Sequence, residues 1–333
     1  MAAPTQYYVD PAAGNDTTGT GAIGTPWATT QHALDTITQD AANGDQINIK
    51  AGTDDVLAAT LDFSTYGTPT GPAPLILRGY TSAANDGGIG GLDGDGSAVI
   101  NSATLDFIYL MDMHLHNAGA GPIVTLDDDI LFYNCEIDNC TGHGLSFGSR
   151  GIVLFCYLHN IGNDAVYTGG AAICLFNYVT NSGSNVISDA FQLISRGNVA
   201  AFNVIDVDRT SGGIECDDKH NLLLCNAIYS AAGSGKGMRL DDNDQIMLGN
   251  LIEGFSDTGG EGIDGNAARQ LLYGHNAFYD NATHTTGLTV ILENLGNNDE
   301  LTASPFVDAA NGDFRPLANH QVTGDAWPAS WAE

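Results

Sequence analysis

The sequence predicts an all-β, single-domain fold in which the chain winds as a parallel β-helix with about 21–26 residues per coil. Three observations support this prediction. A short apolar run with a polar residue or thiol in its middle recurs along the chain, as in LFNYV, AFNVI, LCNAI and LGNLI. A second apolar strand follows each run after a turn rich in Gly, Asn and Asp. No helical periodicity of useful length occurs between residues 100 and 295.

The recurring amide marks one position in each coil. It falls at Asn134, Cys156, Asn177, Asn203, Asn226, Asn250 and Asn276, and Asp112 extends the series backward. Because equivalent residues of successive coils stack about 4.8 Å apart, we expect an inward column whose amides bond to one another and to the turn backbone. Cys156 interrupts this column and weakens it locally. A weaker column is predicted in the following turn, at Asn117, Asn139, Asn160 and Asn181.

The second strand of each coil alternates with period two, which places its side chains on opposite faces. The inward positions are Leu145, Val166, Phe191, Ile214, Met238, Ile263 and Leu288. The outward positions are Ser146, Tyr167, Gln192, Glu215, Arg239, Asp264 and Thr289. A β-propeller is the main competing fold, but its blades need about 40 residues each. The unit of this chain is too short for that.

The ends of the chain are predicted to close the solenoid. Thr29 or Thr30 can cap a short helix that runs to Ile37 and buries Ala33 and Leu34. A first coil needs a cover, and an amphipathic helix provides one. We therefore divide the chain into an N-terminal extension with its capping helix, the β-helix and a C-terminal closing segment, at residues 1–45, 46–300 and 301–333. Trp327 and Trp331 are expected to pack on the last coil or against a partner.

The N-terminal pattern YYVDP…PWATTQHAL followed by GDQINIKAG resembles the start of right-handed parallel β-helix proteins of the pectate-lyase-like superfamily. The C-terminal SPFVDAANGDFRP is similar to the segment that closes many such chains. The resemblance covers nearly the whole sequence and implies a right-handed parallel β-helix. It is specific for fold and not for function, because the superfamily includes polysaccharide lyases, glycoside hydrolases, phage tailspikes and non-catalytic virion proteins.

Charge is the most unusual feature of the composition. Lys plus Arg number 10 and Asp plus Glu number 40, which gives a formal net charge of −30. Such a chain is repelled by nucleic acids, anionic membranes and anionic polysaccharides, unless a cation bridges them. No stretch is long and apolar enough for a membrane span, and the N-terminus lacks the features of a signal peptide. The 6 cysteines lack paired spacing, so we expect free, mostly buried thiols.

The outward column of the second strand is the candidate catalytic face. Glu215, Arg239 and Asp264 lie on successive coils, and Glu215 and Asp264 are expected roughly 9–10 Å apart, at the edge of the spacing that inverting glycosidases use. A lyase would instead need a base and a cation for the substrate carboxylate, and Arg239 or Lys236 could serve. The competing interpretation is a solvated face in which Arg239 bridges Glu215 and Asp264. Residues expected to contact a glycan are Tyr167, Asp189, Gln192, Lys236 and Glu261.

Two acidic turns suggest a metal. In register, Asp217 stacks near Asp241 and Asp218 near Asp242, and like charges at this spacing need neutralisation. Calcium is the natural candidate, with Asn266 as a further ligand; alternatively the turn swings the side chains apart, helped by Lys219. A second stack comprises His116, Asp138 and His159. Zinc binding is conceivable there, but three polar residues at the surface without a metal are the more common explanation.

Two interpretations of function follow. The first is a virion-associated structural protein, decorating the capsid or serving in the tail of a phage, that binds other virion proteins or a cell-surface glycan. This interpretation places the protein at the virion surface after synthesis in the host cytoplasm, without a required cofactor, and allows a homo-oligomer such as a trimer. The absence of a signal peptide and of a strong catalytic motif favours it. The alternative is a polysaccharide lyase or glycoside hydrolase that acts in a groove on the β-helix surface.

Overall fold

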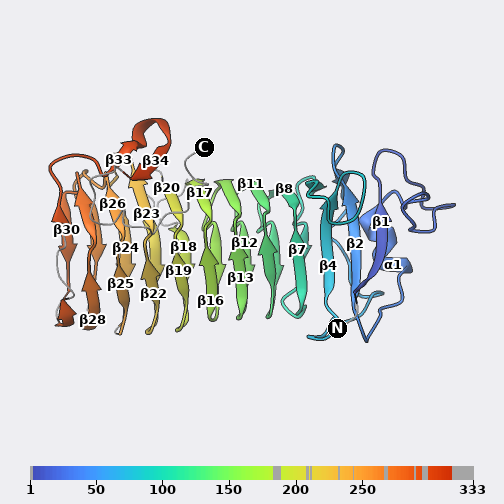
Figure 1. Ribbon diagram of the computed structural model, residues 1–333, viewed down its shortest axis with the longest axis horizontal. Coiled ribbons are helices and arrows are strands. Elements are labelled where there is room, and N and C mark those ends of the chain that lie inside the picture. The colour runs from blue at the N-terminus through green and yellow to red at the C-terminus, as the bar shows by residue number, and fades with distance from the viewer. Residues whose placement is uncertain are drawn as a thin grey trace. The chain divides into compact units, whose positions relative to one another are not determined.

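The computed structural model describes residues 3–182, 189–207, 210, 212–231, 233–242, 244–265, 269–288, 290–294 and 299–316. The chain divides into two compact units, residues 1–158 and 159–333, here called unit 1 and unit 2. In each unit the chain passes in turn through three parallel sheets (Figure 1). The prediction of an all-β parallel β-helix with a short N-terminal helix is therefore confirmed.

In unit 1 the three sheets are built by the following strands. Sheet 1 comprises β1 (Thr5–Val9), β2 (Asp45–Lys50), β4 (Leu75–Tyr80), β7 (Ile108–Met111), β10 (Leu131–Tyr133) and β13 (Gly151–Leu154). Sheet 2 comprises β3 (Asp55–Val56), β5 (Gly90–Asp93), β8 (Met113–Gly119) and β11 (Glu136–Cys140). Sheet 3 comprises β6 (Ile100–Asn101), β9 (Val124–Leu126) and β12 (Leu145–Phe147). The next strand of sheet 2, β14 (Tyr157–Ile161), spans the boundary between the units.

Unit 2 repeats the same arrangement. Sheet 1 comprises β16 (Ala172–Leu175), β19 (Val199–Ala201), β22 (Leu222–Leu224), β25 (Ile246–Leu248), β28 (Arg269–Gly274) and β31 (Val290–Asn294). Sheet 2 comprises β17 (Tyr178–Ser182), β20 (Val204–Val207), β23 (Ala227–Ser230), β26 (Leu251–Glu253), β29 (Ala277–Tyr279) and β32 (Asp299–Glu300). Sheet 3 comprises β15 (Val166–Thr168), β18 (Asp189–Leu193), β21 (Gly212–Cys216), β24 (Lys236–Leu240), β27 (Glu261–Asp264) and β30 (Thr283–Thr286).

The predicted capping helix is α1 (Thr30–Thr36). Thr29 is its N-cap and its side chain accepts a hydrogen bond from the backbone N–H of His32 at 3.2 Å, as N-cap threonines commonly do. Ala33 and Leu34 are fully buried, and the helix ends at Ile37. The helix prediction is confirmed, and the N-terminal segment also contributes β1, which pairs in parallel with β2.

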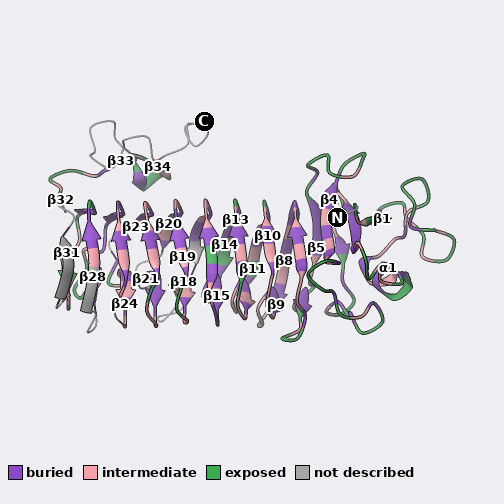
Figure 2. Ribbon diagram, turned by 60° about the horizontal axis from the view of Figure 1, so that its bottom comes forward, coloured by how far each residue is buried: buried purple, intermediate pink, exposed green. Residues whose placement is uncertain are grey.

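The interior of each unit is filled by the inward residues of these strands, which alternate with partly exposed ones (Figure 2). In unit 2 this interior includes a column of five fully buried amides: Asn177, Asn203, Asn226, Asn250 and Asn276. Each Nδ2 of the first four donates to Oδ1 of the next amide at 2.9–3.0 Å. Each backbone N–H of the same four donates to that oxygen at 3.0–3.2 Å. The predicted ladder is confirmed for this part of the chain.

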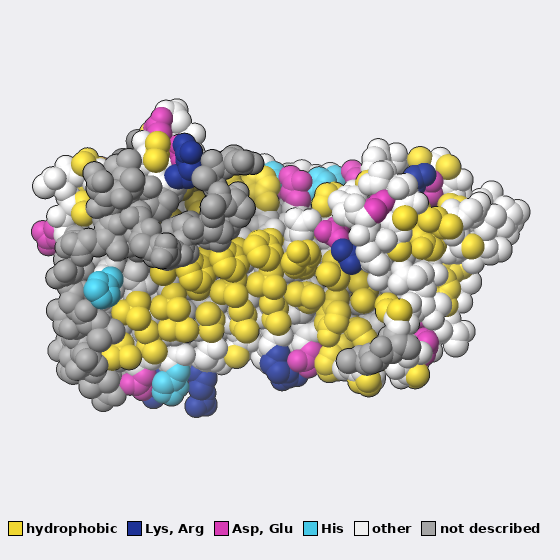
Figure 3. All heavy atoms as spheres, in the orientation of Figure 1, with side chains coloured by type: hydrophobic (Ala, Val, Ile, Leu, Met, Phe, Trp, Pro, Cys, Tyr) yellow, Lys and Arg dark blue, Asp and Glu magenta, His cyan; other side chains and the backbone are white. Residues whose placement is uncertain are grey.

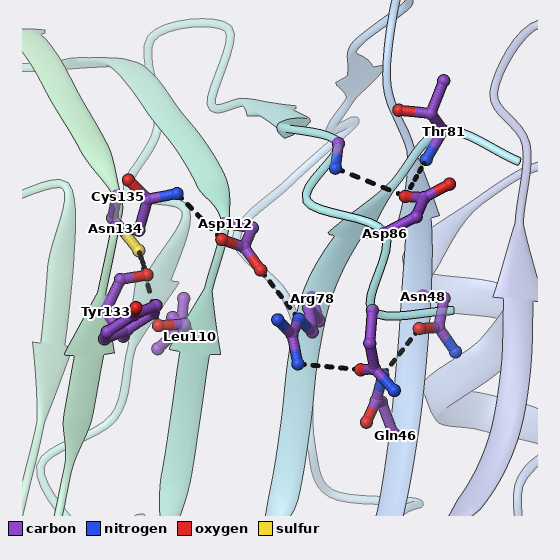
Figure 4. Close-up of polar contacts among 12 residues, drawn as sticks. Gln46, Asn48, Arg78, Thr81, Asp86, Leu110, Asp112, Tyr133, Asn134 and Cys135 are labelled. Atoms are coloured by element: carbon purple, nitrogen blue, oxygen red, sulfur yellow. Dashed lines mark hydrogen bonds and ion pairs between the residues drawn. The ribbon is translucent and has the colours of Figure 1, made fainter. Parts of the chain in front are cut away.

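Asn134 does not belong to this kind of column, so its assignment to the ladder is wrong. Tyr133 pairs with Leu154, which puts Cys135 and not Asn134 level with Cys156. Asn134 is exposed and has a φ of 52°, a left-handed conformation that Asn tolerates better than most residues. Its Nδ2 donates to Asp112 Oδ1 at 2.8 Å, and Arg78 Nε donates to Asp112 Oδ2 at 2.7 Å (Figure 4).

The weaker column predicted in the following turn consists of left-handed corners. Asn117, Asn139 and Asn160 have φ values of 60°, 63° and 52°, and Asn139 Nδ2 donates to Asn117 Oδ1. The side chain of Asn181 lies outside the described part of the chain. A further buried ladder, which sequence analysis missed, precedes sheet 1 of unit 2. Asn198 Nδ2 donates to Asn221 Oδ1 at 2.9 Å, and the N–H of Asn221 donates to Gln245 Oε1 at 3.1 Å.

The closing segment forms an antiparallel pair, β33 (Phe306–Asp308) and β34 (Asp313–Pro316), joined through a 3-10 turn at Ala309–Asn311. Phe306 and Phe314 are buried against the outer side of sheet 2 in unit 2, where they meet Val204, Ala227, Leu251 and Ala277. Ser304 Oγ donates to Glu253 Oε2 at 2.6 Å. Trp327 and Trp331 lie outside the described residues, so their packing stays a prediction.

The outer face of sheet 1 in unit 2 is apolar. Figure 3 shows hydrophobic side chains gathered over this sheet, and in unit 2 their outward, partly exposed members are Ile173, Leu175, Val199, Leu222, Leu224, Ile246 and Leu248. In unit 2 these strands of sheet 1 are therefore apolar on both faces, which explains their unbroken hydrophobic sequences. All 6 cysteines are free, and Cys225 alone among them is partly exposed. Within the described residues, no helix is long and apolar enough to cross a membrane.

Candidate functional site

The candidate site lies on the outer face of sheet 3 in unit 2. Strand register stacks Tyr167, Gln192, Glu215, Arg239, Asp264 and Thr286 on successive coils. The predicted outward column is confirmed as far as Asp264. Its last member is wrong, because the sixth strand of this sheet is Thr283–Thr286 and not the segment 287–291. The coil after Asp264 is shorter than expected, and Thr289 lies outside the described residues.

Glu215 is the central residue of this face. Although it points outward, the residue is only 6% exposed. Arg239 Nη1 lies 2.7 Å from Glu215 Oε1, and Arg239 Nη2 lies 2.8 Å from Asp241 Oδ2. The expectation that Arg239 bridges Glu215 and Asp264 is therefore corrected: its second partner is Asp241. Arg239 pairs with Asp241 in a bidentate manner, because Arg239 Nε also donates to Asp241 Oδ1 at 3.3 Å. Planar guanidinium groups favour such two-bond pairing with a carboxylate.

Asp189 completes the buried end of the cluster. It pairs with Gly212 across the two strands, and a Cβ at Gly212 would lie 1.7 Å from Asp189 Oδ1. Because Gly212 has no side chain, the carboxyl group of Asp189 can occupy the space over it and lie toward Glu215. Burial, together with the hydrogen bond and the charge of Glu215, raises the pKa of Asp189 well above its usual range. The backbone N–H of Asp189 donates to Asp164 Oδ1 at 2.9 Å.

The carboxylates of Glu215, Asp217 and Asp241 converge. One oxygen from each lies within 4.8 Å of the others, and burial with the adjacent Glu215 raises the pKa of Asp217 to about 6. Three carboxylates are the hard oxygen donors that calcium prefers, so these residues fit a calcium ion, with Arg239 supplying part of the neutralising charge. The predicted approach of Asp217 to Asp241 is thus seen.

The other half of the predicted calcium set is not part of this cluster. Asp218 Oδ1 accepts a hydrogen bond from the backbone N–H of Lys219 at 2.8 Å, and Asp242 does not join Glu215, Asp217 and Asp241. Asp218 is likewise not among the converging carboxylates of the described residues. Asn266 lies outside the described residues.

A second polar group lies farther along the same face. Lys236 Nζ is 2.7 Å from Glu261 Oε1, and the two residues pair across β24 and β27. Thr286 Oγ1 donates to Glu261 Oε2 and lies 3.4 Å from Asp264 Oδ1. Burial and the charge of Glu261 raise the pKa of Asp264. Unit 2 therefore carries a continuous polar face whose two ends are Tyr167 and Thr286.

Comparison with known proteins supports the fold. No protein-family profile and no curated protein matches the sequence. A rhamnogalacturonan lyase structure is similar with a TM-score of 0.54, 14% identity and coverage of 97% of both chains. A GH136 lacto-N-biosidase from Eubacterium ramulus is similar with a TM-score of 0.50, 14% identity and coverage of 87% of this chain and 67% of that chain. The protein has the fold of a right-handed parallel β-helix, as the sequence resemblance implied.

The same comparisons bear on the two interpretations of function. The structural neighbours named here are a polysaccharide lyase and a glycoside hydrolase, and neither is a virion protein. At these identities the likeness establishes the fold alone. Nothing in it points to a virion role, so the carbohydrate-active alternative is the better supported of the two interpretations.

Proposed function

We propose that the protein cleaves a polysaccharide on the outer face of sheet 3 in unit 2. The observation that carries this proposal is Glu215, an outward-facing carboxylate that is nevertheless buried, against Arg239 and among acidic residues. A solvated, charge-alternating face would leave such a carboxylate exposed. Burying acidic groups together is unfavourable for stability, and perturbed carboxyl groups cluster at functional sites.

The reaction that this arrangement favours is β-elimination on a uronate-containing chain, which makes the enzyme a polysaccharide lyase. Elimination requires that the substrate carboxylate is neutralised and that a base removes the adjacent proton. Arg239 is partly exposed and presents a guanidinium to the solvent side of the cluster, where it can pair with a carboxylate. Lys236, on the same face, is the candidate base once its ammonium proton has passed to Glu261, whose Oε1 lies 2.7 Å from Lys236 Nζ.

Glu215, Asp217 and Asp241 would hold a calcium ion. Calcium would bridge the acidic protein to the uronate and withdraw electron density from its carboxylate. The bridging also accounts for how a chain with a net charge of −30 binds an anionic polymer. Asp189, protonated near neutral pH because its pKa is raised, keeps the negative charge of the cluster lower and donates a hydrogen bond to Glu215.

The test is cleavage of a panel of neutral and uronate-containing polysaccharides, with and without calcium. We expect unsaturated products from a uronate polymer, and a loss of at least about 100-fold in rate for Glu215→Gln and for Arg239→Ala. Arg150→Ala is the matched control, because Arg150 also pairs with carboxylates, Asp128 and Asp129, but lies in unit 1. Absence of cleavage across the panel, or equal rates in all three variants, would contradict the proposal.

A glycoside hydrolase is the second candidate, and one observation favours it. Glu215 and Asp264 flank Arg239 on adjacent strands, so they are separated by two strand spacings, roughly 9–10 Å. This separation lies at the edge of the range for inverting enzymes. The products distinguish the two reactions: a hydrolase releases reducing ends without unsaturated sugar, and its activity requires Asp264.

The binding partners of the protein are a separate question from its activity. A virion role, with other virion proteins or a cell-surface glycan as partners, and a homo-oligomer such as a trimer remain predictions. A carbohydrate-active β-helix carried on a phage tail would satisfy both interpretations at once. Glycan cleavage by the isolated chain therefore tests the enzymatic proposal without excluding an assembly.

A further inference from the structure

A cluster of imidazoles and carboxylates lies on sheet 2 of unit 1, in a different unit from the candidate catalytic site. In β8 the side chains of Met113 and Leu115 are fully buried, so His114 and His116 project from the outer face. Their rings stack, with centroids 4.2 Å apart and planes inclined by 6°. Two imidazoles at positions i and i+2 of one strand thus face the same direction.

Carboxylates reach both rings from the neighbouring coils. His114 Nε2 lies 2.7 Å from Asp138 Oδ1, and His116 Nε2 lies 3.2 Å from Asp54 Oδ2. The sequence had suggested a stack of His116, Asp138 and His159. Strand register confirms that His116 and Asp138 are neighbours across β8 and β11, but the Asp138 carboxylate contacts the ring of His114, diagonally across the two strands.

Glycine at position 91 makes the approach of Asp54 feasible. Gly91 pairs with His114 across β5 and β8, and a Cβ at Gly91 would lie 1.7 Å from Asp54 Oδ1. The Asp54 carboxylate therefore occupies the space in which another residue would carry its side chain. Asp54, His114 and His116 each present a ligand atom within 4.8 Å of the others.

We propose that Asp54, His114, His116 and Asp138 form a binding site for a divalent transition metal of the zinc class. Imidazole nitrogen combined with carboxylate oxygen suits zinc, nickel and copper better than calcium or magnesium. In a tetrahedral site with bonds of about 2.0 Å, neighbouring ligand atoms lie roughly 3.3 Å apart. The two histidine–carboxylate contacts, at 2.7 and 3.2 Å, are already near that separation.

Metal binding requires a local rearrangement. The ion would bind the Nε2 atoms of both histidines, which now face the carboxylates. To allow this, the parallel rings would turn toward one point. Their side chains are 28% and 12% exposed, so they lie at the surface and not in the interior. The bound metal would join the segment at Asp54 to β8 and β11, which come from later coils of unit 1.

The experiment is a calorimetric titration of the full chain, freed of metal by chelation, with zinc, calcium and magnesium chloride at neutral pH. We expect one zinc ion per chain, with no comparable effect of calcium at this site. His114→Ala, His116→Ala and Asp54→Asn should each weaken zinc binding by at least about 10–100-fold, the loss that even residues behind metal ligands cause. Asp54 is 42% exposed, so its substitution is the variant least expected to disturb folding.

Two controls separate this site from others. His220→Ala removes a comparable exposed histidine, paired with Asp244 at 3.3 Å in unit 2, and should retain zinc affinity. Glu215→Gln should retain it as well, which keeps this test independent of the proposed lyase activity. Cobalt provides a second readout, because its visible spectrum reports tetrahedral nitrogen and oxygen ligation. Zinc binding that survives all three site variants, or its absence from the wild-type chain, would overturn the proposal.

Discussion

Asparagine occupies two physically different positions in this fold. In unit 2 the buried amides of the ladder bond to each other and to main-chain groups, so that each replaces the hydrogen bonds it would make with water. Asn134 instead turns the chain in a left-handed conformation at the surface. The two positions are adjacent in the coil and share one residue type, but their contributions to stability differ.

Substitution of a ladder amide should therefore be far more damaging than substitution of a corner amide. Asn226→Ala removes the oxygen that accepts from both Asn203 Nδ2 and the Asn203 N–H. It leaves buried groups without partners, at about 1–3 kcal/mol each. We expect a loss of about 3 kcal/mol or more, measured by denaturant unfolding. Asn134→Ala, the matched control, should lose about 1 kcal/mol because its partners remain accessible to water. Equal losses would contradict the ladder's role.

The sequence could predict the ladder but not its boundary. Asn134 and Asn177 occur in nearly identical apolar runs, and a displacement of one residue separates corner from interior. The cysteines Cys135 and Cys156 take the interior position in unit 1, and no amide marks it there. Likewise, the outward direction of Glu215 followed from alternation, whereas its burial depends on neighbouring coils that local sequence does not reveal.

At the scale of elements, register is what the repeat predicts best. The stacking of Gln192, Glu215, Arg239 and Asp264 follows from strands with period two and turns of similar length. The prediction failed where a turn shortened, at β30, because the sequence after Asp264 offers two alternating segments. The contact of Asp54 with His116 joins residues 62 positions apart, across coils whose long loops obscure the repeat.

The closing segment provides a test at this scale. Glu253, on β26, is 7% exposed and accepts a hydrogen bond from Ser304. Ser304→Ala should lower the stability by about 1–2 kcal/mol at pH 7, as for a hydrogen bond to a charged group. Thermal unfolding measures this change. Loss of the closing segment's protection from proteolysis, without a change in the rest of unit 2, would support a local effect.

Glu253 also predicts a dependence on pH. Burial raises its pKa in the folded protein, with a smaller contribution from Asp280. The folded state therefore binds more protons than the unfolded state above the unfolded pKa of about 4.3, so this residue makes stability fall as pH rises. Glu253→Gln should be more stable than wild type at pH 7, and the difference should shrink as the pH approaches 4. A difference that is constant with pH would contradict this assignment.

At the scale of the whole molecule, the excess of acidic over basic residues is the dominant electrostatic feature. In unit 2 the outer face of sheet 1 is apolar, whereas ion pairs such as Lys236 with Glu261 and Arg239 with Glu215 lie on sheet 3. With 40 acidic and 10 basic residues, most carboxylates have no basic side chain to pair with. The compact chain therefore carries a large uncompensated repulsion, which the unfolded chain relieves by expanding.

Added salt should for this reason stabilise the protein. Raising sodium chloride from about 0.01 M to 1 M shortens the Debye length from about 30 to 3 Å, which screens the repulsion among carboxylates. It also weakens the exposed ion pairs, but each of these contributes only about 0–1 kcal/mol. Because 10 basic residues offset only a quarter of the 40 acidic ones, repulsion should dominate, and the unfolding temperature should rise by a few degrees. A fall in that temperature would show instead that the ion pairs outweigh the repulsion.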